Sequence, residues 1–509
     1  MPNLKRSSVI ALAVLSLSGC GSLPEQVVHS NDPVIFTTST LSQLSAKSEP
    51  NNVGTKANSV VLQESGWDAL SQRLALVELA EHTIDIQYYI WNSDVSGLYL
   101  ANRLYAAADR GVKVRVMLDD INLNEREDLL TALDAHPNIE IRVFNPVPTR
   151  RGVTKWLSFL GDFSRLNRRM HNKSFTVDGA FSIVGGRNIG DEYFDLSDEI
   201  NFKDRDVLVS GDVVSDIQSG FVDYWTSRWA YPVELLGGEV DTSLPTSDQI
   251  TKPTYASYPQ LPADKADSSQ LLTKVMEGAD WVEANYIYDD PIPSEVSDTD
   301  TPKRTAQYLS ELVDTATDSV VMESAYLVFD DSQLEEWQQL EQTGVDVKAL
   351  TNSMASNDLV TNHSAYAGRR QEMLEHGIDL YELKPDSKLC IESTKDSNKC
   401  APSVAYGLHT KSLVIDDRVA SIGSFNFNLR STYLNTESIL VINDQEVAKK
   451  LNDKMERALT DDNSWRLELK DGDVYWQSGD REWDKEPETG KWRRMQSSFL
   501  QLLPIEKYL

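Results

Sequence analysis

The chain has 509 residues, of which 25% are charged and 40% are hydrophobic, the composition of an ordinary globular protein. This length allows two or three domains with ample core. The formal net charge of −30 argues against a general nucleic-acid binder, which needs a basic surface to displace counterions from phosphates. We therefore expect no nucleic-acid partner.

The first residues indicate export rather than a folded domain. Residues 1–19 hold two basic residues, an apolar run too short to span a membrane, and then small residues, which is typical of a signal peptide. The letters LSGC, which end at Cys20, resemble a bacterial lipobox and imply a lipidated Cys20; a plain signal peptide with a chance cysteine is the alternative. Gly21 follows instead of Asp, which by resemblance to sorted lipoproteins favours the outer membrane, facing the periplasm.

The elements that follow alternate between helix and strand. Residues 20–55 are rich in Ser, Thr, Asn and Pro and predict a tether. Residues 65–91 predict a helix and then a strand, and residues 96–120 predict a second such pair. The alternation returns at residues 305–329 and 335–353, and it favours an α/β fold with a parallel or mixed sheet.

A stretch with the composition of a linker, residues 241–269, separates the two halves. We therefore predict a first domain at residues 56–250, a linker at 251–270 and a second domain at 271–509.

One motif occurs twice. HNKSFTVDGAFSIVGGRN starts at His171, and HTKSLVIDDRVASIGSFN starts at His409. His, Lys, Asp, Gly and Asn recur at the constant offset 409 − 171 = 238. A repeat of this length indicates a duplicated domain, because solenoid repeats run to about 20–50 residues.

Each copy of the motif predicts a β-hairpin. In the first copy, Asp178 and Gly179 occupy a two-residue turn, which sets His171 opposite Gly186 and returns Asn188 to its side. The second copy is expected to fold in the same way, with the corresponding residues Asp416, Asp417, His409, Ser424 and Asn426. The motif aspartates fall at the turns, so we interpret them as structural members of the motif.

The motif carries the residue types of phosphoryl transfer. His and Lys two apart on a strand point from the same face, so two copies packed about a pseudo-twofold axis would join two His and two Lys in one site. One His can be the nucleophile and the other the acid–base, while ammonium, amide and hydroxyl donors neutralise the phosphoryl group without a metal or cofactor. A single His-x-Lys would indicate only a surface strand. The catalytic motif residues are His171, Lys173, Asp178, His409, Lys411 and Asp416, and the expected substrate contacts in the motif are Asn188, Asn426 and Ser424.

The motif H-x-K-x4-D-x6-G-[GS]-x-N resembles that of the phospholipase D superfamily in both copies. From about residue 60 to the C-terminus, stretches such as DIQYYIW, GGRNIGDEYFD and RSTYLNTE resemble the bacterial cardiolipin synthase C-type branch. The resemblance implies two duplicated phospholipase D-like α/β domains with central mixed sheets. Gly186 stands where the superfamily often has Ser, so one hydroxyl donor is expected to be missing from the first copy.

The resemblance also implies roles. His171 would attack phosphorus to form a phosphohistidine, and His409 would protonate the leaving alcohol and then deprotonate the acceptor. Glu437, within YLNTE, resembles the acid that orients a catalytic His, and we group it with the substrate site. Asp206 is the candidate for the same role in the first half.

A basic, aromatic segment at residues 150–169 runs directly into His171. The functional interpretation is an interfacial helix that binds anionic head groups, with Arg168 and Arg169 as substrate contacts. The alternative is a packed amphipathic helix with solvated arginines.

Cys390 and Cys400 bracket a polar loop. Export to an oxidising compartment predicts a disulfide between them. Two thiols without a nearby His do not complete a zinc site, and we expect no metal.

The leading function is a phosphatidyltransferase that makes cardiolipin from phospholipids such as phosphatidylglycerol and phosphatidylethanolamine, on a chain anchored by its N-terminal lipid. Two alternatives stay open. One is a hydrolytic phospholipase D, exported phosphodiesterase or nuclease, and the other is a non-catalytic membrane scaffold. The sequence leaves the phosphatidyl donor and acceptor undecided.

Overall fold

The computed structural model describes residues 38–49, 56–123, 127–147, 163–236, 250–255, 257–291, 301–501 and 506–508. The expected signal peptide, Cys20 and residues 150–162 of the basic, aromatic segment lie outside these ranges. Within the expected tether, α2 (Thr40–Ser48) is a helix that begins with a capping box at Ser39 and buries Leu41. Across the described ranges, no helix is long and apolar enough to cross a membrane.

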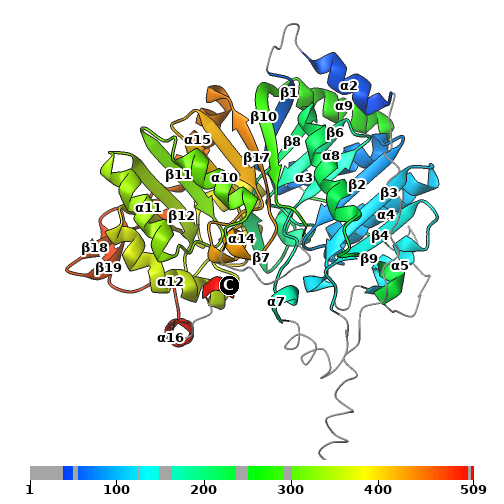
Figure 1. Cartoon of the computed structure of the whole chain (residues 1–509). Helices are drawn as coiled ribbons and strands as arrows, with labels where there is room; N and C mark the ends of the chain where they lie inside the picture. Colours follow the sequence, from blue (N-terminus) through cyan, green and yellow to red (C-terminus); the bar gives the residue numbers. More distant parts are fainter. Residues whose placement is uncertain are drawn as a thin grey trace, which may run out of the picture.

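The first half forms one mixed sheet with helices on it (Figure 1). Its elements are β1 (Asn58–Gln63), α3 (Gly66–Leu79), β2 (Thr83–Tyr88), α4 (Val95–Asp109), β3 (Lys113–Asp119), α5 (Glu127–Asp134), β4 (Ile139–Phe144), α7 (Phe163–Leu166), β5 (Ser174–Val177), β6 (Phe181–Gly185), β7 (Ile200–Lys203), β8 (Asp206–Gly211), α8 (Val213–Trp225) and β9 (Ala230–Pro232). The strand order is β1-β8-β6-β5-β2-β3-β4-β9, and β2, β3 and β4 are parallel.

The second half repeats this order. Its elements are α9 (Lys265–Met276), β10 (Asp280–Tyr288), α10 (Arg304–Val313), β11 (Ser319–Ser324), α11 (Asp331–Gln342), β12 (Asp346–Asn352), α12 (Val360–Glu375), β13 (Ile378–Leu383), α13 (Lys388–Thr394), β14 (Ala405–Leu408), β15 (Lys411–Ile415), β16 (Val419–Gly423), α14 (Leu429–Tyr433), β17 (Ser438–Asn443), α15 (Gln445–Ala458), β18 (Ser464–Lys470), β19 (Asp473–Ser478), β20 (Arg481–Trp483) and α16 (Lys491–Leu500). The order β10-β17-β16-β15-β11-β12-β13-β18 matches the first half strand for strand. The predicted duplication and the four predicted helix–strand pairs are therefore confirmed.

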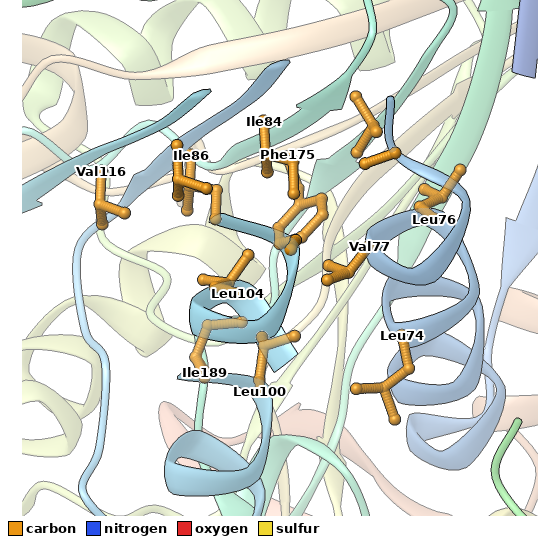
Figure 2. Close-up of a cluster of buried hydrophobic side chains, with 14 of the residues drawn as sticks. Leu74, Leu76, Val77, Ile84, Ile86, Leu100, Leu104, Val116, Phe175 and Ile189 are labelled. Carbon is orange, nitrogen blue, oxygen red and sulfur yellow. The ribbon is translucent and has the colours of Figure 1, made fainter. Parts of the chain in front are cut away.

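Buried apolar side chains pack on both faces of the sheet. In the first half, α3 and α4 pack on one face of the sheet, where Val77 and Leu104 lie in one cluster with Ile86 and Phe175 of the strands (Figure 2). Side chains alternate along each strand, so β8 sends Leu208 into this cluster and its neighbours Val207 and Val209 into another. That second cluster also takes residues of β10, β16 and β17, and the two halves therefore share a core.

Backbone pairing also joins the halves. β1 pairs with β10, so both sheets continue into each other, and β7 of the first half lies parallel to β14 of the second. α9 packs on α3, and its Leu272 and Met276 are buried in the core of the first half. Although α9 opens the second half in sequence order, it therefore packs with the first half, and the domain boundaries at 250 and 270 stay predictions.

The motif hairpins differ from the expectation by one residue. β5 and β6 pair Val177 with Phe181, so the connection has three residues and not two, and the expected register of His171 opposite Gly186 is wrong. Asp178 and Gly179 take positive φ angles of 52° and 59°, which a three-residue connection accommodates. The second hairpin shifts in the same way, because Ile415 pairs with Val419, and the expected position of Ser424 opposite His409 is likewise wrong.

The motif aspartates anchor these three-residue connections by hydrogen bonds to the backbone. The carboxylate of Asp178 accepts hydrogen bonds from the backbone N–H groups of Glu81, His82 and Thr83, at 2.8–3.0 Å. The carboxylate of Asp416 accepts from the equivalent groups of the second half, those of Thr317, Asp318 and Ser319. Each aspartate thus ties its hairpin to the loop before the neighbouring strand and does not reach the histidines.

A disulfide joins Cys390 in α13 to Cys400, with Cα atoms 5.8 Å apart. It closes the loop before β14, the strand that leads into His409.

We expect Asp416→Asn to lower the free energy of unfolding by about 1 kcal/mol at neutral pH, because the backbone N–H groups lose a charged acceptor. Burial opposes the charge of Asp416, but its backbone donors and Arg418 hold the pKa of this carboxyl well below the usual value. The stabilisation is therefore full above about pH 4 and is lost as the pH falls through the folded pKa. Urea unfolding over a pH series measures this.

The matched control is Asp417→Asn, because Asp417 lies in the same connection at a similar positive φ and bonds only the side chain of Asn452 among the described residues. It should change the free energy of unfolding by less than about 0.5 kcal/mol. Equal losses in the two variants would contradict the role given to Asp416.

Candidate active site

The structure brings the two motifs together between the halves. His171 and Lys173 lie just before β5, and His409 and Lys411 lie at the start of β15. The N–H of His171 donates to the carbonyl of Thr436 at 2.8 Å, and the N–H of His409 donates to the carbonyl of Lys203 at 2.7 Å. The backbone of the opposite half therefore positions each histidine.

Each histidine also contacts a carboxylate of the opposite half. His171 Nδ1 lies 2.8 Å from Glu437 Oε2, and His409 Nδ1 lies 2.6 Å from Asp204 Oδ2. Both carboxylates are fully buried. A carboxylate on Nδ1 fixes the tautomer and leaves Nε2 for a reacting atom.

Asp206, the expected acid of the first half, is not the partner of a histidine. Its carboxylate lies 2.7 Å from Arg73 and accepts the N–H of Arg187, and both arginines are buried. The register of the sheets identifies the residue that takes the expected role of Asp206, two positions earlier in the chain. Val184 pairs with Val207 and Ile422 pairs with Leu440, which makes residue 204, not residue 206, the equivalent of Glu437.

The two acids differ in their support. Ser424 Oγ donates to Glu437 at 2.5 Å, and Ser431 Oγ donates to its other oxygen at 2.7 Å. Gly186 stands at the position equivalent to Ser424, and a Cβ there would lie 2.3 Å from the Asp204 carboxylate. The glycine therefore makes room for the acid, and the N–H of Arg205 donates to Asp204 at 2.7 Å.

Both motif lysines are buried beside their histidines. Lys173 Nζ donates to the carbonyl of His171 at 2.6 Å, and Lys411 Nζ donates to the carbonyl of His409. Burial lowers the pKa of Lys173 to about 7 and that of Lys411 to about 8. Two ammonium groups held in one site form a ready partner for a phosphoryl anion.

The motif asparagines flank the same region. The Oδ1 of Asn188 accepts the N–H of Ile90 at 3.3 Å. The Oδ1 of Asn426 is buried and meets no hydrogen-bond partner in the described part of the chain. Because amide orientation follows the local hydrogen-bond network, Asn426 can turn its NH₂ group toward a phosphoryl oxygen.

Aromatic rings that the sequence did not single out pack on the histidines. Tyr89 lies 4.9 Å from His171 between ring centroids, and Tyr193 and Phe202 lie 5.2 and 5.3 Å from His409. Tyr89 directly follows the buried strand β2, and this position at the end of a predicted strand could have identified it as a candidate site residue.

Burial controls the charge of the histidines. Together with the neighbouring lysines, burial lowers the pKa of His171 well below the usual value and that of His409 to about 4. Both rings are therefore neutral near pH 7 before substrate binds. A neutral imidazole is the nucleophilic form.

Arg168 and Arg169 are buried and do not form an exposed patch. Arg169 pairs with Asp119 at 3.1 Å, and Asp119 also accepts the N–H of Met170 at 2.8 Å. Arg169 thus helps to fix the chain just before His171, whereas the rest of the expected interfacial segment, up to residue 162, lies outside the described residues.

Comparison with known proteins shows the family of the chain. The family described as "Cardiolipin synthase, PLD-like domain" matches residues 74–225 and 309–459. Cardiolipin synthase C of Escherichia coli (strain K12) is 37% identical over 457 residues, which cover 87% of this chain and 94% of that protein. An uncharacterized protein of Helicobacter pylori (strain J99 / ATCC 700824) is 31% identical over 485 residues and 92% of each chain.

The solved structure of phosphatidylserine synthase from Haemophilus influenzae Rd KW20 has the same fold, with a TM-score of 0.58 at 12% identity over 91% of this chain and 100% of that one. The family match and the relative at 37% identity show that the chain is an enzyme of the phospholipase D superfamily. Within it, the chain belongs to the family of cardiolipin synthase phospholipase D-like domains.

The two neighbouring aspartates of the first half can be separated by mutation. We expect Asp204→Asn to lower turnover about 100-fold with little loss of stability, because His409 loses the acid that orients it. Asp206→Asn should instead lower the free energy of unfolding by about 3 kcal/mol, because Arg73 stays buried without its counter-charge. Turnover per folded protein and thermal unfolding of both variants test this, and the reverse pattern would restore Asp206 as the orienting acid.

The buried lysines predict an alkaline limb in the pH profile. kcat/KM should fall between about pH 7 and pH 8, as Lys173 and Lys411 lose the protons that attract the substrate anion. The limb of kcat should lie at higher pH, because a bound phosphodiester raises both lysine pKa values. Steady-state rates over a pH series check this, and a flat kcat/KM through this range would show that neither lysine binds as an ammonium group.

Proposed function

We propose that the chain is a phosphatidyltransferase that moves a phosphatidyl group between phospholipids through a phosphohistidine, as a cardiolipin synthase does. The observation that carries the proposal is the paired arrangement of His171 with Glu437 and His409 with Asp204, beside two buried lysines. The kinship with cardiolipin synthase C supports the lipid substrate.

The proposed reaction has two displacements at phosphorus. His171 Nε2 attacks, the N–P bond forms, the P–O bond to the leaving alcohol breaks, and His409 gives that alcohol a proton. The phosphodiester anion and Asp204 favour the protonated form of His409 in the complex. His409 then takes the proton of the acceptor hydroxyl, which attacks phosphorus and releases His171.

The proposed phosphoryl ligands are Lys173, Lys411, Asn188 and Asn426. Two ammonium groups neutralise the charge that grows on the non-bridging oxygens, and the amides add directional donors. We assign Ser424 to the support of Glu437, because its hydroxyl already donates to that acid. Among the described residues, no cluster of His, Cys, Asp or Glu could hold a metal ion.

Transfer and hydrolysis share the first displacement and differ in which hydroxyl attacks next. The side chains of His171 and His409 keep only about 8% of their surface exposed, which limits access of water. A lipid acceptor is held at the membrane by its acyl chains, so its hydroxyl is concentrated there. We therefore propose phosphatidylglycerol as an acceptor and cardiolipin as a product, with phosphatidylethanolamine as a further candidate substrate.

We also propose that lipid attached to Cys20 holds the enzyme at the cell envelope, at the outer membrane facing the periplasm. The lipobox-like LSGC sequence supports this placement.

The decisive experiment uses purified enzyme with mixed vesicles of phosphatidylglycerol and phosphatidylethanolamine, followed by lipid analysis. We expect cardiolipin. If the products are phosphatidic acid and free head group without cardiolipin, the transferase proposal is wrong and the hydrolytic phospholipase D takes its place.

His409→Ala should lower steady-state turnover at least about 100-fold and still accumulate lipid phosphate covalently bound to His171, since attack and proton transfer are separate roles. Near-normal turnover of His409→Ala would defeat the shared site.

A further inference from the structure

The helix α16 exposes three large apolar residues, and the one residue that it buries is a serine. Trp492, Met495 and Phe499 are 65%, 55% and 63% exposed, the three most exposed large hydrophobic side chains among the described residues. Their spacing of three and four residues places them in one stripe along the helix. We call these three residues the α16 stripe.

The opposite side of α16 is polar. Ser497 is buried, and Arg493 and Arg494 donate to backbone carbonyls, those of Asn357 for the first and Glu486 and Thr489 for the second. A surface helix that packed only for stability would show the reverse pattern, with its apolar stripe against the protein. The α16 stripe therefore faces outward for a purpose other than packing within the chain.

The charge of α16 contrasts with that of the whole chain. The helix has three basic residues, Lys491, Arg493 and Arg494, and no acidic one, in a chain of net charge −30. All three lie near its N-terminus, where the helix dipole disfavours cations. The hydrogen bonds of the two arginines go to neutral carbonyls, and Arg493 also interacts with the carboxylates of Asp358 and Glu486, so Lys491 and Arg494 are the cations of α16 that we expect to meet an anionic surface.

α16 is also connected to the rim of the active site. Arg493 holds the carbonyl of Asn357, and the next residue, Asp358, accepts from Tyr326 at 3.1 Å and acts on the charge of Lys411. Just beyond α16, the carbonyl of Tyr508 accepts from Arg430 at 3.0 Å, and Arg430 adds to the effect of burial in lowering the pKa of His171. Figure 1 shows α16 at the same lower end of the molecule as α7, which precedes His171.

We infer that α16 docks on an anionic phospholipid bilayer, with the α16 stripe in the upper acyl region and its basic residues among the head groups. An aromatic and apolar stripe beside basic residues is the pattern of a helix that lies in a membrane interface. Docking there turns the rim of the active site toward the surface that holds the substrate. The inference rests on the proposed lipid substrate and adds the element that presents the site to it.

The test uses the full chain on vesicles of phosphatidylglycerol and phosphatidylethanolamine, and compares turnover of vesicle lipid with turnover of a short-chain, water-soluble phosphodiester. The variant carries Trp492→Ser, Met495→Ser and Phe499→Ser. We expect its turnover of vesicle lipid to fall at least about tenfold, and its turnover of the soluble diester to stay within about twofold. The control carries Ile391→Ser and Leu469→Ser, exposed apolar residues of α13 and β18, and should keep both activities.

A second readout does not depend on activity. Lipids brominated on their acyl chains should quench part of the tryptophan fluorescence of the native chain, and Trp492→Phe should remove that part. Unchanged vesicle turnover in the triple variant, together with unchanged quenching in Trp492→Phe, overturns the inference. If Trp492→Phe loses the quenching but the native chain transforms neither the vesicle lipid nor the soluble diester, docking is upheld and the proposed function is rejected instead.

A second copy of the chain is the other possible occupant of the stripe. If light scattering without vesicles shows a dimer that the triple variant converts to monomer, and bromolipids do not quench Trp492, the stripe joins two copies and the membrane inference is wrong.

Discussion

Each half of the structure supplies the carboxylate that contacts the motif histidine of the other half, and the rest of the site depends on these two contacts. Glu437 of the second half holds His171 of the first, and Asp204 of the first half holds His409 of the second. Neither histidine would be oriented within its own half. The duplicated fold therefore gives one site and not two, and the packing of the halves is a condition for chemistry as well as for stability.

A buried ion network fixes this packing around Asp204. The residues on either side of it, Lys203 and Arg205, both contact Glu323 of β11, at 2.6 and 2.7 Å. Arg205 also pairs with Glu64; burial opposes the charge of that carboxyl, but the cations around it hold its pKa well below the usual value. Removal of one partner from such a network leaves an uncompensated buried charge, which typically costs about 3–5 kcal/mol. A displacement of the segment between β7 and β8 would therefore cost much stability. The ion network thus holds Asp204 in the position where it contacts His409.

Most of the fold and part of the site could be predicted from the sequence. Duplication, the helix–strand pairs and the meeting of His171 with His409 follow from a repeat at constant offset, because equal spacing preserves equal placement on a strand. The hairpin register did not follow, because it depends on the positive φ angles of Asp178 and Gly179, which allow a three-residue connection where the letters also fit a two-residue turn. The choice between Asp204 and Asp206 did not follow either, because the spacing from motif histidine to acid differs between the halves, 204 − 171 = 33 against 437 − 409 = 28, and so does not single out one aspartate. Only the pairing of β8 with β6 resolves this difference.

The departures from symmetry support separate roles for the two histidines. Burial opposes ionisation of both acids, but His409 and Lys411 hold the pKa of Asp204 below its usual value, whereas burial raises that of Glu437 to about 7 despite the hydroxyl groups of Ser424 and Ser431. The ionised Asp204 favours the imidazolium form of His409, which an acid–base must reach. Glu437, partly protonated and spread over two hydroxyl donors, offers less charge to His171 and leaves it neutral, which a nucleophile must be. The halves also differ at the Ser424 and Gly186 positions, where one half has a hydroxyl that donates to the acid and the other has only the space that lets the acid approach. This asymmetry supports the proposal that one motif of the duplicated pair supplies the nucleophile and the other the proton carrier.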